Sequence, residues 1–145
     1  MSGVLKLDTL KKRARRAGVN NIETRDIDSS KIIKRMENSA DRLLLDVPCS
    51  GMGVLRRNPD AKWKLSPEFI EKIKNEQQKI LSSYSLMLKS GGVMVYSTCS
   101  ILFSENEKQI EKFLSNNKNF ELLEAKKNLP SQGFDGFYMC AIKKR

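Results

Sequence analysis

Two continuous apolar runs predict neighbouring strands of a parallel sheet, one over residues 42–46 and the other over residues 92–97. A strand that is buried on both faces is an unbroken apolar run, whereas a half-exposed strand alternates. Between them, helical spacing with Ser66 as N-cap and Pro67 at the first position predicts a long helix that ends near Lys89. The order strand, helix, strand is the unit from which parallel sheets are built.

Weaker patterns predict further elements on both sides of this unit. They are a helix over 6–17 that ends at Gly18, a short strand over 21–25, a helix from Ser29 or Ser30 to about Met36, a helix over 104–114, and an antiparallel pair over 120–123 and 137–142. Strands that alternate with helices indicate an α/β fold. We expect a mainly parallel sheet with an antiparallel closing strand.

The composition indicates a reducing compartment. The three cysteines Cys49, Cys99 and Cys140 are odd in number and widely spaced, so they predict no disulfide framework. The longest apolar runs fall far short of the roughly 20 residues that a membrane span needs, and no signal-peptide pattern is present. Histidine is absent, which argues against histidine triads, imidazole bases and most zinc sites. We expect a cytoplasmic protein with no membrane partner and no metal.

The charge favours a polyanionic partner. Lysine and arginine number 27 against 17 acidic residues, a formal net charge of +10, and a nucleic-acid backbone is the obvious partner for such an excess. Arg56 and Arg57 are candidate RNA contacts, and they are also candidates for lowering the pKa of a reactive cysteine thiol. The alternative is that these cations only solvate the surface.

Two cysteines and a carboxylate follow the two strong strands, in DVPCSG at 46–51 and STCS at 97–100. The ligand crevice of an open α/β sheet lies outside the carboxyl ends of its strands. Because neighbouring strands lie about 4.8 Å apart, we expect Asp46, Cys49 and Cys99 at one edge, with the sulfurs within roughly 10 Å. Such a group suits nucleophilic chemistry on a planar base. Cys140 and Trp63 are expected to be packing residues.

The full motif set resembles one enzyme family. It comprises DVPCSG at 46–51, LRRNPD at 55–60, Gln77, YSTCSI at 96–101, ENE at 105–107 and DGFY at 135–138. Together these motifs resemble the Nol1/Nop2/Sun family of RNA cytosine-5 methyltransferases, and its bacterial ribosomal RNA (RsmB-like) branch most of all. The family's closing motif is usually DGFF, so Tyr138 is a departure.

The resemblance implies a covalent mechanism. In the family, the cysteine of the second motif adds to C6 of cytosine and that of the first motif assists release, which corresponds to Cys99 and Cys49. Asp46 is expected to hydrogen-bond the N3/N4 edge of the base. The resemblance also implies S-adenosyl-L-methionine as cofactor, with contacts from Asp46, Pro48 and Asp28; Asp26 is the fallback for Asp28.

The chain departs from the family before its first strong strand. The family's glycine-rich donor loop, the acid that holds the donor ribose and the N-terminal RNA-binding region have no counterpart here. We interpret residues 1–145 as the C-terminal part of a Rossmann-like methyltransferase domain, completed by upstream sequence or another polypeptide.

Three readings stay open. The chain belongs to a working enzyme acting on RNA, expected to be ribosomal RNA; it is an inactive remnant that only binds RNA; or it is a DNA cytosine-5 methyltransferase, in which Cys49 would be the nucleophile.

Overall fold

A computed structural model describes residues 3–27 and 30–145. The chain divides into two compact units, the first ending at Arg35 and the second beginning at Met36. The first unit contains α1 (Gly3–Arg16) and α2 (Ser30–Arg35). Gly18 ends α1 as expected, with φ of 71°, a left-handed conformation that glycine adopts without a Cβ penalty. Its neighbour Val19 donates its N–H to the carbonyl of Ala14 at 2.9 Å.

The strand expected over residues 21–25 is wrong. Residues 19–27 have no regular structure, and Ile22 and Ile27 are exposed. A strand exists only when a neighbour takes up its backbone hydrogen bonds, and no strand in the described residues pairs with this segment.

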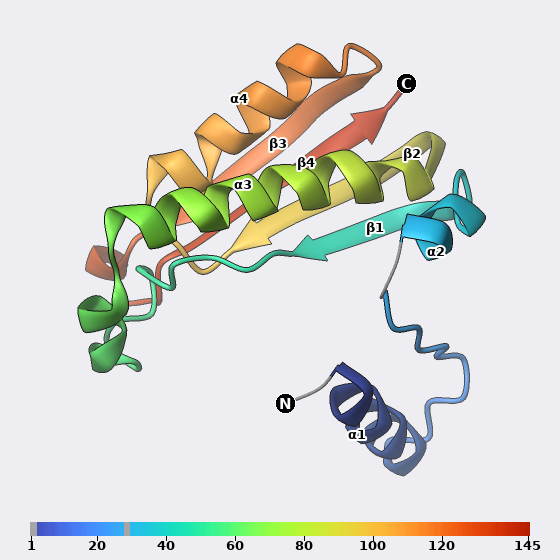
Figure 1. Cartoon of the computed structure of the whole chain (residues 1–145), viewed down its shortest axis with the longest axis horizontal. Coiled ribbons are helices and arrows are strands. Elements are labelled where there is room, and N and C mark those ends of the chain that lie inside the picture. Colours follow the sequence, from blue (N-terminus) through green and yellow to red (C-terminus); the bar gives the residue numbers. More distant parts are fainter. Residues whose placement is uncertain (1–2, 28–29) are drawn as a thin grey trace. The chain divides into compact units, whose positions relative to one another are not determined.

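The second unit is built on a four-stranded sheet in the order β1-β2-β4-β3 (Figure 1). Its strands are β1 (Ala40–Asp46), β2 (Leu88–Thr98), β3 (Phe120–Asn128) and β4 (Phe137–Lys144). β1 and β2 pair in parallel, whereas β4 is antiparallel to both β2 and β3. Three strands therefore run in one direction and β4 alone opposes them, which confirms the expected fold class.

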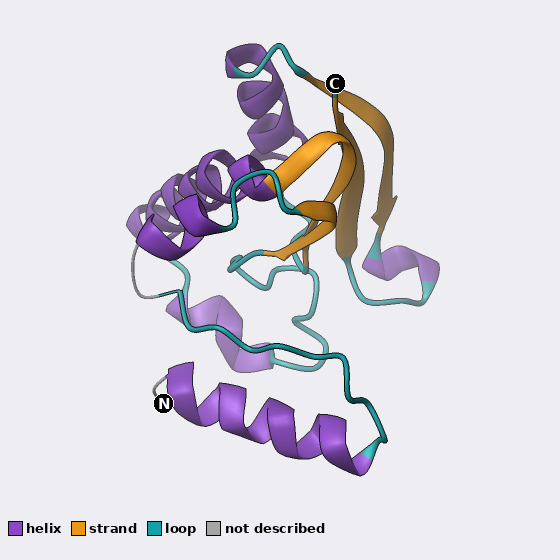
Figure 2. Ribbon diagram, turned by 90° about the vertical axis from the view of Figure 1, so that its right-hand side faces the viewer, coloured by secondary structure: helices purple, strands orange, loops and turns teal. Residues whose placement is uncertain are grey.

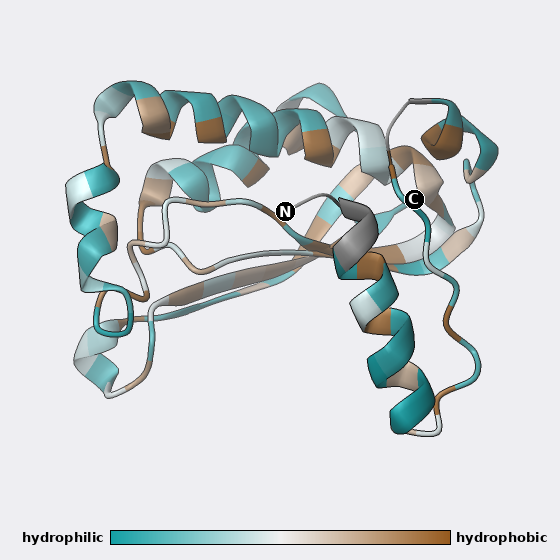
Figure 3. Ribbon diagram, turned by 60° about the horizontal axis from the view of Figure 1, so that its bottom comes forward, coloured by the Kyte–Doolittle hydropathy of each residue, from teal (hydrophilic) through white to brown (hydrophobic). Residues whose placement is uncertain are grey.

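Two helices cover one face of this sheet, α3 (Pro67–Tyr84) and α4 (Glu107–Asn116) (Figures 1 and 2). Ser66 caps α3 by accepting the N–H of Phe69 at 3.2 Å, as predicted. Apolar positions recur along the side of α3 that faces the sheet, whereas α1 is mostly hydrophilic (Figure 3). The core lies between the helices and the sheet. Its most deeply buried side chains are Leu81, Leu88, Met94, Tyr96, Phe113 and Ile142. None of the helices in the described residues is long and apolar enough to span a membrane.

The end of α3 differs from the expectation. The helix stops at Tyr84, a 3-10 turn follows over Ser85–Met87, and β2 begins at Leu88. Leu88 is fully buried and already pairs with Ala40. The two glycines at 91 and 92 lie inside β2, where the register with β1 shifts, so they mark an irregularity in a strand and not the end of a helix.

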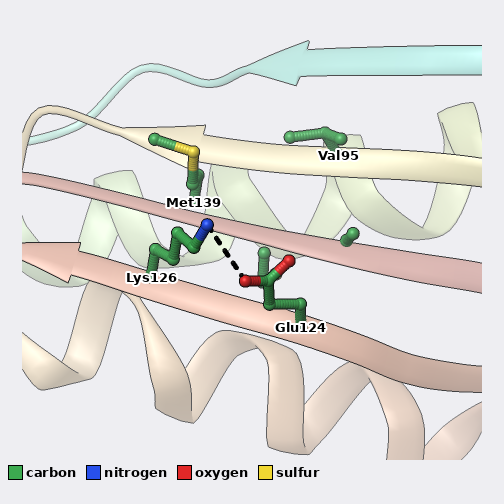
Figure 4. A pocket seen from close by; sticks show the side chains of 6 residues that line it. Val95, Glu124, Lys126 and Met139 are labelled. Carbon is green, nitrogen blue, oxygen red and sulfur yellow. Dashed lines mark ion pairs between the residues drawn. The ribbon is translucent and has the colours of Figure 1, made fainter.

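Neither α3 nor α4 covers the other face of the sheet (Figure 2). Leu44 of β1 is 69% exposed there. A shallow pocket of about 120 Å³ lies over β2, β3 and β4, lined by Val95, Glu124, Lys126, Met139, Cys140 and Ala141 (Figure 4). An ion pair between Lys126 and Glu124 crosses it. Neither Cys49 nor Cys99 lines this pocket, so the chemistry predicted from the sequence lies elsewhere.

Candidate active site

The two motif cysteines meet at the carboxyl ends of β1 and β2. Asp46, the last residue of β1, pairs with Ser97 in β2, so the segments that follow leave the sheet side by side. The sulfurs of Cys49 and Cys99 are 3.0 Å apart, which confirms the expected proximity. Cys140 lies inside β4 with 1% of its surface exposed, and its role as a packing residue is confirmed.

The contact divides the two thiols into an acid and a base. The hydrogen bond from Cys49 lowers the pKa of Cys99 from 9.0 to about 7, against the opposing effects of burial and of the nearby Asp46 and Glu105 carboxyls. The same hydrogen bond, together with burial, raises the pKa of Cys49 far above its usual value. At pH 7, about half of the pairs therefore carry one negative charge, centred on the Cys99 sulfur.

The arginines expected to assist this thiolate do not provide the main effect. Cys49 is the largest cause of the lowered pKa of Cys99. Arg57 forms an ion pair with Asp135 and is 74% exposed. Arg56 is also exposed on the same loop, which follows Cys49.

Two glycines allow three loops to pack tightly around the cysteines. Gly53 donates its N–H to the carbonyl of Cys99 at 2.9 Å, and Gly136 donates to the carbonyl of Gly53 at 2.8 Å. A Cβ on Gly53 would lie 2.1 Å from the oxygen of Gly136, and one on Gly136 would lie 2.4 Å from Ile101. Only glycine fits at such distances, so the DGFY turn is fixed against both cysteine loops.

A buried polar network lies beneath the cysteines, and sequence reasoning assigned it no role. Its members are Ser50, Gln77, Ser100, Glu105 and Asn106, all less than 8% exposed. One signal was present in the sequence: Gln77 falls in the same helical stripe as Ile73 and Leu81, the other buried residues of α3. A polar residue in a buried apolar stripe needs hydrogen-bond partners, and that need indicates a network.

The remaining candidates are distributed around this edge. Asp46 is exposed at the end of β1, with Oδ1 3.5 Å from Ser97 Oγ. The carbonyl of Pro48 accepts a hydrogen bond from Gln77 Nε2 at 2.9 Å. Asp28 lies outside the described residues, and Asp26 is exposed in the first unit.

Trp63 is not the packing anchor that was expected. It is 78% exposed, and Lys62 Nζ lies 4.7 Å from its ring centroid. The 3-10 segment Pro59–Lys64 that carries it has no buried residue.

Known proteins are similar to this chain in fold and in sequence. NSun6 from Pyrococcus horikoshii, solved with SFG, superposes with a TM-score of 0.81 at 25% identity, over 95% of this chain and 38% of that chain. The probable ribosomal RNA small subunit methyltransferase B of Bacillus subtilis strain 168 is 33% identical over 97% of this chain and 36% of its own length. The methyltransferase B of Yersinia enterocolitica is 43% identical over 72% of this chain and 26% of its own length.

These similarities define a methyltransferase fold. Residues 4–141 match the family described as 16S rRNA methyltransferase RsmB/F, and the chain belongs to that family. It spans about a quarter to a third of the length of the two curated relatives.

Proposed function

We propose that this chain carries the catalytic cysteines of an S-adenosyl-L-methionine-dependent RNA cytosine-5 methyltransferase whose substrate is ribosomal RNA. The observation that supports this most strongly is the asymmetric thiol pair, in which Cys99 has a pKa near 7 and Cys49 remains protonated. A thiolate at neutral pH is the form that adds to an electron-poor ring carbon. The directions of the two pKa shifts agree with Cys99 as the nucleophile, the assignment that the family resemblance implies.

In this proposal, Cys99 makes the covalent bond. Its thiolate adds to C6 of the target cytosine, and the electron pair released from the C5–C6 double bond makes C5 nucleophilic. The exposed Asp46 carboxylate accepts hydrogen bonds from the N4 amino group and from N3 once N3 is protonated. It thereby stabilises the charge that develops on the ring during addition. When bound, S-adenosyl-L-methionine supplies the electrophilic methyl group that C5 takes up.

Cys49 acts at the end of the reaction. After C5 has lost its proton to solvent, the bond between C6 and the Cys99 sulfur breaks and the electron pair returns to that sulfur. Cys49 is 3.0 Å from it and carries the proton. Its S–H donates a hydrogen bond to the departing thiolate, which lowers the barrier to elimination.

The described residues fit one side of a donor site. Asp46 and the backbone at Pro48 lie at the carboxyl end of β1, where ligands of α/β sheets bind. The outer edge of β1 has no partner strand in the described residues. No glycine occurs between Gly18 and Gly51, so a glycine-rich cradle for the rest of the cofactor would come from an upstream segment or another polypeptide. The solved relative NSun6 was crystallised with SFG, an analogue of the cofactor.

Binding of RNA would rest on the charge around this edge. Arg56 and Arg57 follow Cys49 on an exposed loop, and Trp63 offers an exposed ring on which a base can stack. Three free thiols and an RNA substrate fit a reducing cytoplasm.

The test is methyl transfer by the protein completed with the N-terminal strands of the Bacillus subtilis relative. We expect radiolabelled methyl groups from S-adenosyl-L-methionine on cytosine C5 of small-subunit ribosomal RNA. Binding of RNA with no transfer by the completed protein would favour the inactive remnant instead.

A further inference from the structure

The buried side chain of Glu105 bridges the two cysteine loops, and the chemistry proposed above does not use it. Glu105 ends the 3-10 turn Phe103–Glu105 and is fully buried. Its Oε2 accepts the backbone N–H of Ser50 at 2.8 Å, and its Oε1 accepts the hydroxyl of Ser100 at 3.1 Å. Ser50 directly follows Cys49, and Ser100 directly follows Cys99. One carboxylate thus holds the immediate neighbour of each reacting thiol.

This carboxylate is costly for the fold to keep. Burying a charged group is unfavourable unless hydrogen bonds or an opposite charge compensate for it. None of the ion pairs in the described part of the chain includes Glu105. Its compensation comes from Ser50, Ser100 and Gln77, whose Nε2 lies 3.2 Å from Oε2. A buried carboxylate without hydrogen bonds would destabilise the fold, so its hydrogen bonds to the two loops are strongly favoured. A carboxylate in this position is therefore suited to fixing the geometry of the two loops.

Asn106 and Tyr96 act on the Cys99 side of the bridge, whereas Gln77 holds the Pro48 carbonyl on the Cys49 side. Asn106 accepts a hydrogen bond from Thr98 Oγ1 at 2.6 Å and donates to the carbonyl of Ser100 at 2.9 Å. Both contacts are to the loop that carries Cys99. The Tyr96 hydroxyl donates to the Glu105 carbonyl at 2.7 Å and so fixes the Glu105 backbone to β2. Glu105 reaches from that anchored position to the loop of Cys49. The Ser50 and Ser100 hydroxyls, 3.2 Å apart, add a further link between the two loops.

We propose that Glu105 is a positioning residue that sets the separation of the Cys49 and Cys99 sulfurs by holding both loops through one carboxyl group. The inference rests on the proposed function only in taking these two thiols as the reacting pair.

The test compares length with charge at position 105 in the 145-residue chain. Glu105→Gln keeps the length and can still accept from Ser50 and donate to Ser100, but it has no charge. Glu105→Asp keeps the charge but is one methylene too short to reach both loops. The readout is the equilibrium in glutathione buffers, in which Cys49, Cys99 and oxidised glutathione give the protein disulfide and two reduced glutathiones. This equilibrium measures how closely the fold holds the two sulfurs.

We expect Glu105→Gln to leave this equilibrium close to that of the unchanged protein. Glu105→Asp should lower the disulfide equilibrium constant about tenfold, which corresponds to a potential about 30 mV higher for a two-electron couple. Equal effects of the two substitutions, or no effect of Glu105→Asp, would overturn the proposal. Ser100→Ala removes the Oε1 contact together with the hydroxyl contacts to Ser50 Oγ and the Leu102 N–H. It should shift the equilibrium in the same direction, and it serves if Glu105→Asp does not fold.

The pH profile of Cys99 alkylation by iodoacetamide separates positioning from a merely structural role. Glu105→Gln removes a charge that raises the pKa of Cys99, so its profile should move to lower pH. Glu105→Asp loosens the contact with Cys49, so its profile should move to higher pH. Shifts of the same sign would contradict the proposal. The matched control is Glu111→Gln on the exposed side of α4, which should change neither readout. Because neither assay contains RNA or S-adenosyl-L-methionine, failure here is distinct from failure of the proposed function.

Discussion

Removing the Cys49 sulfur should change the reactivity of Cys99 in opposite directions at low and high pH. Cys49→Ala deletes the hydrogen bond that is the largest cause of the lowered pKa of Cys99. Burial and the carboxyls of Asp46 and Glu105 remain, and all of them raise that pKa. The pKa of Cys99 should therefore return from about 7 to its ordinary value of 9.0 or above.

The size of the effect follows from two opposing terms. At pH 7, about half of Cys99 is thiolate when its pKa is 7, against about one per cent when it is 9, a loss of roughly 50-fold. The more basic thiolate is intrinsically more reactive, by roughly eightfold for two pKa units. The net rate of alkylation at pH 7 should therefore fall about sixfold. Well above pH 9, where both proteins are mostly thiolate, only the difference in intrinsic reactivity remains, so the variant should instead react about eightfold faster.

The assay is the rate of carbamidomethylation of Cys99 by iodoacetamide from pH 5.5 to 10, followed by mass spectrometry of the intact 145-residue chain. Cys140 is an internal control, because burial raises its pKa to about 11 and it is 1% exposed. The two pH profiles should cross between pH 7 and 9. Profiles with the same midpoint would refute the reasoning, since the Cys99 pKa would then owe nothing to Cys49.

Three further predictions concern RNA, cofactor and packing. In the protein completed with its N-terminal strands, Cys99→Ala should abolish both methyl transfer and any covalent adduct, whereas Cys49→Ala should leave an RNA–protein complex that survives denaturing electrophoresis; the reverse pattern would exchange the two roles. The isolated chain should bind S-adenosyl-L-methionine weakly or not at all, and low-micromolar affinity by calorimetric titration would show that its own residues form a complete cradle. Gly53→Ala should cost about 2 kcal/mol or more in urea unfolding, because its Cβ would lie 2.1 Å from the Gly136 oxygen; unchanged stability would mean that these loops move apart freely.

The sequence alone predicts that the two cysteines meet at one edge of the sheet, because the patterns that indicate the two strands are local. Unbroken apolar runs predict β1 and β2, and the parallel pairing of Asp46 with Ser97 then brings the following cysteines together. The role of Glu105 depends on contacts with residues as far as 55 positions away, and no periodicity in the chain reveals such contacts. Similarity to the family indicated that Glu105 was part of a motif, but not what it holds.

The incorrect expectations share a cause in tertiary structure. Gly91 and Gly92 are ordinary helix-ending residues by local rules, yet strand pairing begins earlier, at Leu88. Residues 21–25 have a strand-like pattern but no neighbouring strand in the described residues. Trp63 was expected to be buried from its size alone, whereas its 3-10 segment lies at the surface. In each case the structure of the segment depends on which distant residues pair with it or pack against it, and the local sequence does not contain that information.

The position of β4 imposes an order on folding. β4 (Phe137–Lys144) is the last strand in the chain, but it lies between β2 and β3 in the sheet. During synthesis, β1, α3 and β2 emerge first and can pack as a unit, while β3 must wait without a partner strand. Gly136, which packs against the cysteine loops, immediately precedes β4. A nascent chain that stalls before residue 136 would already contain both cysteines, but it would lack the Gly136 contact that packs against their loops.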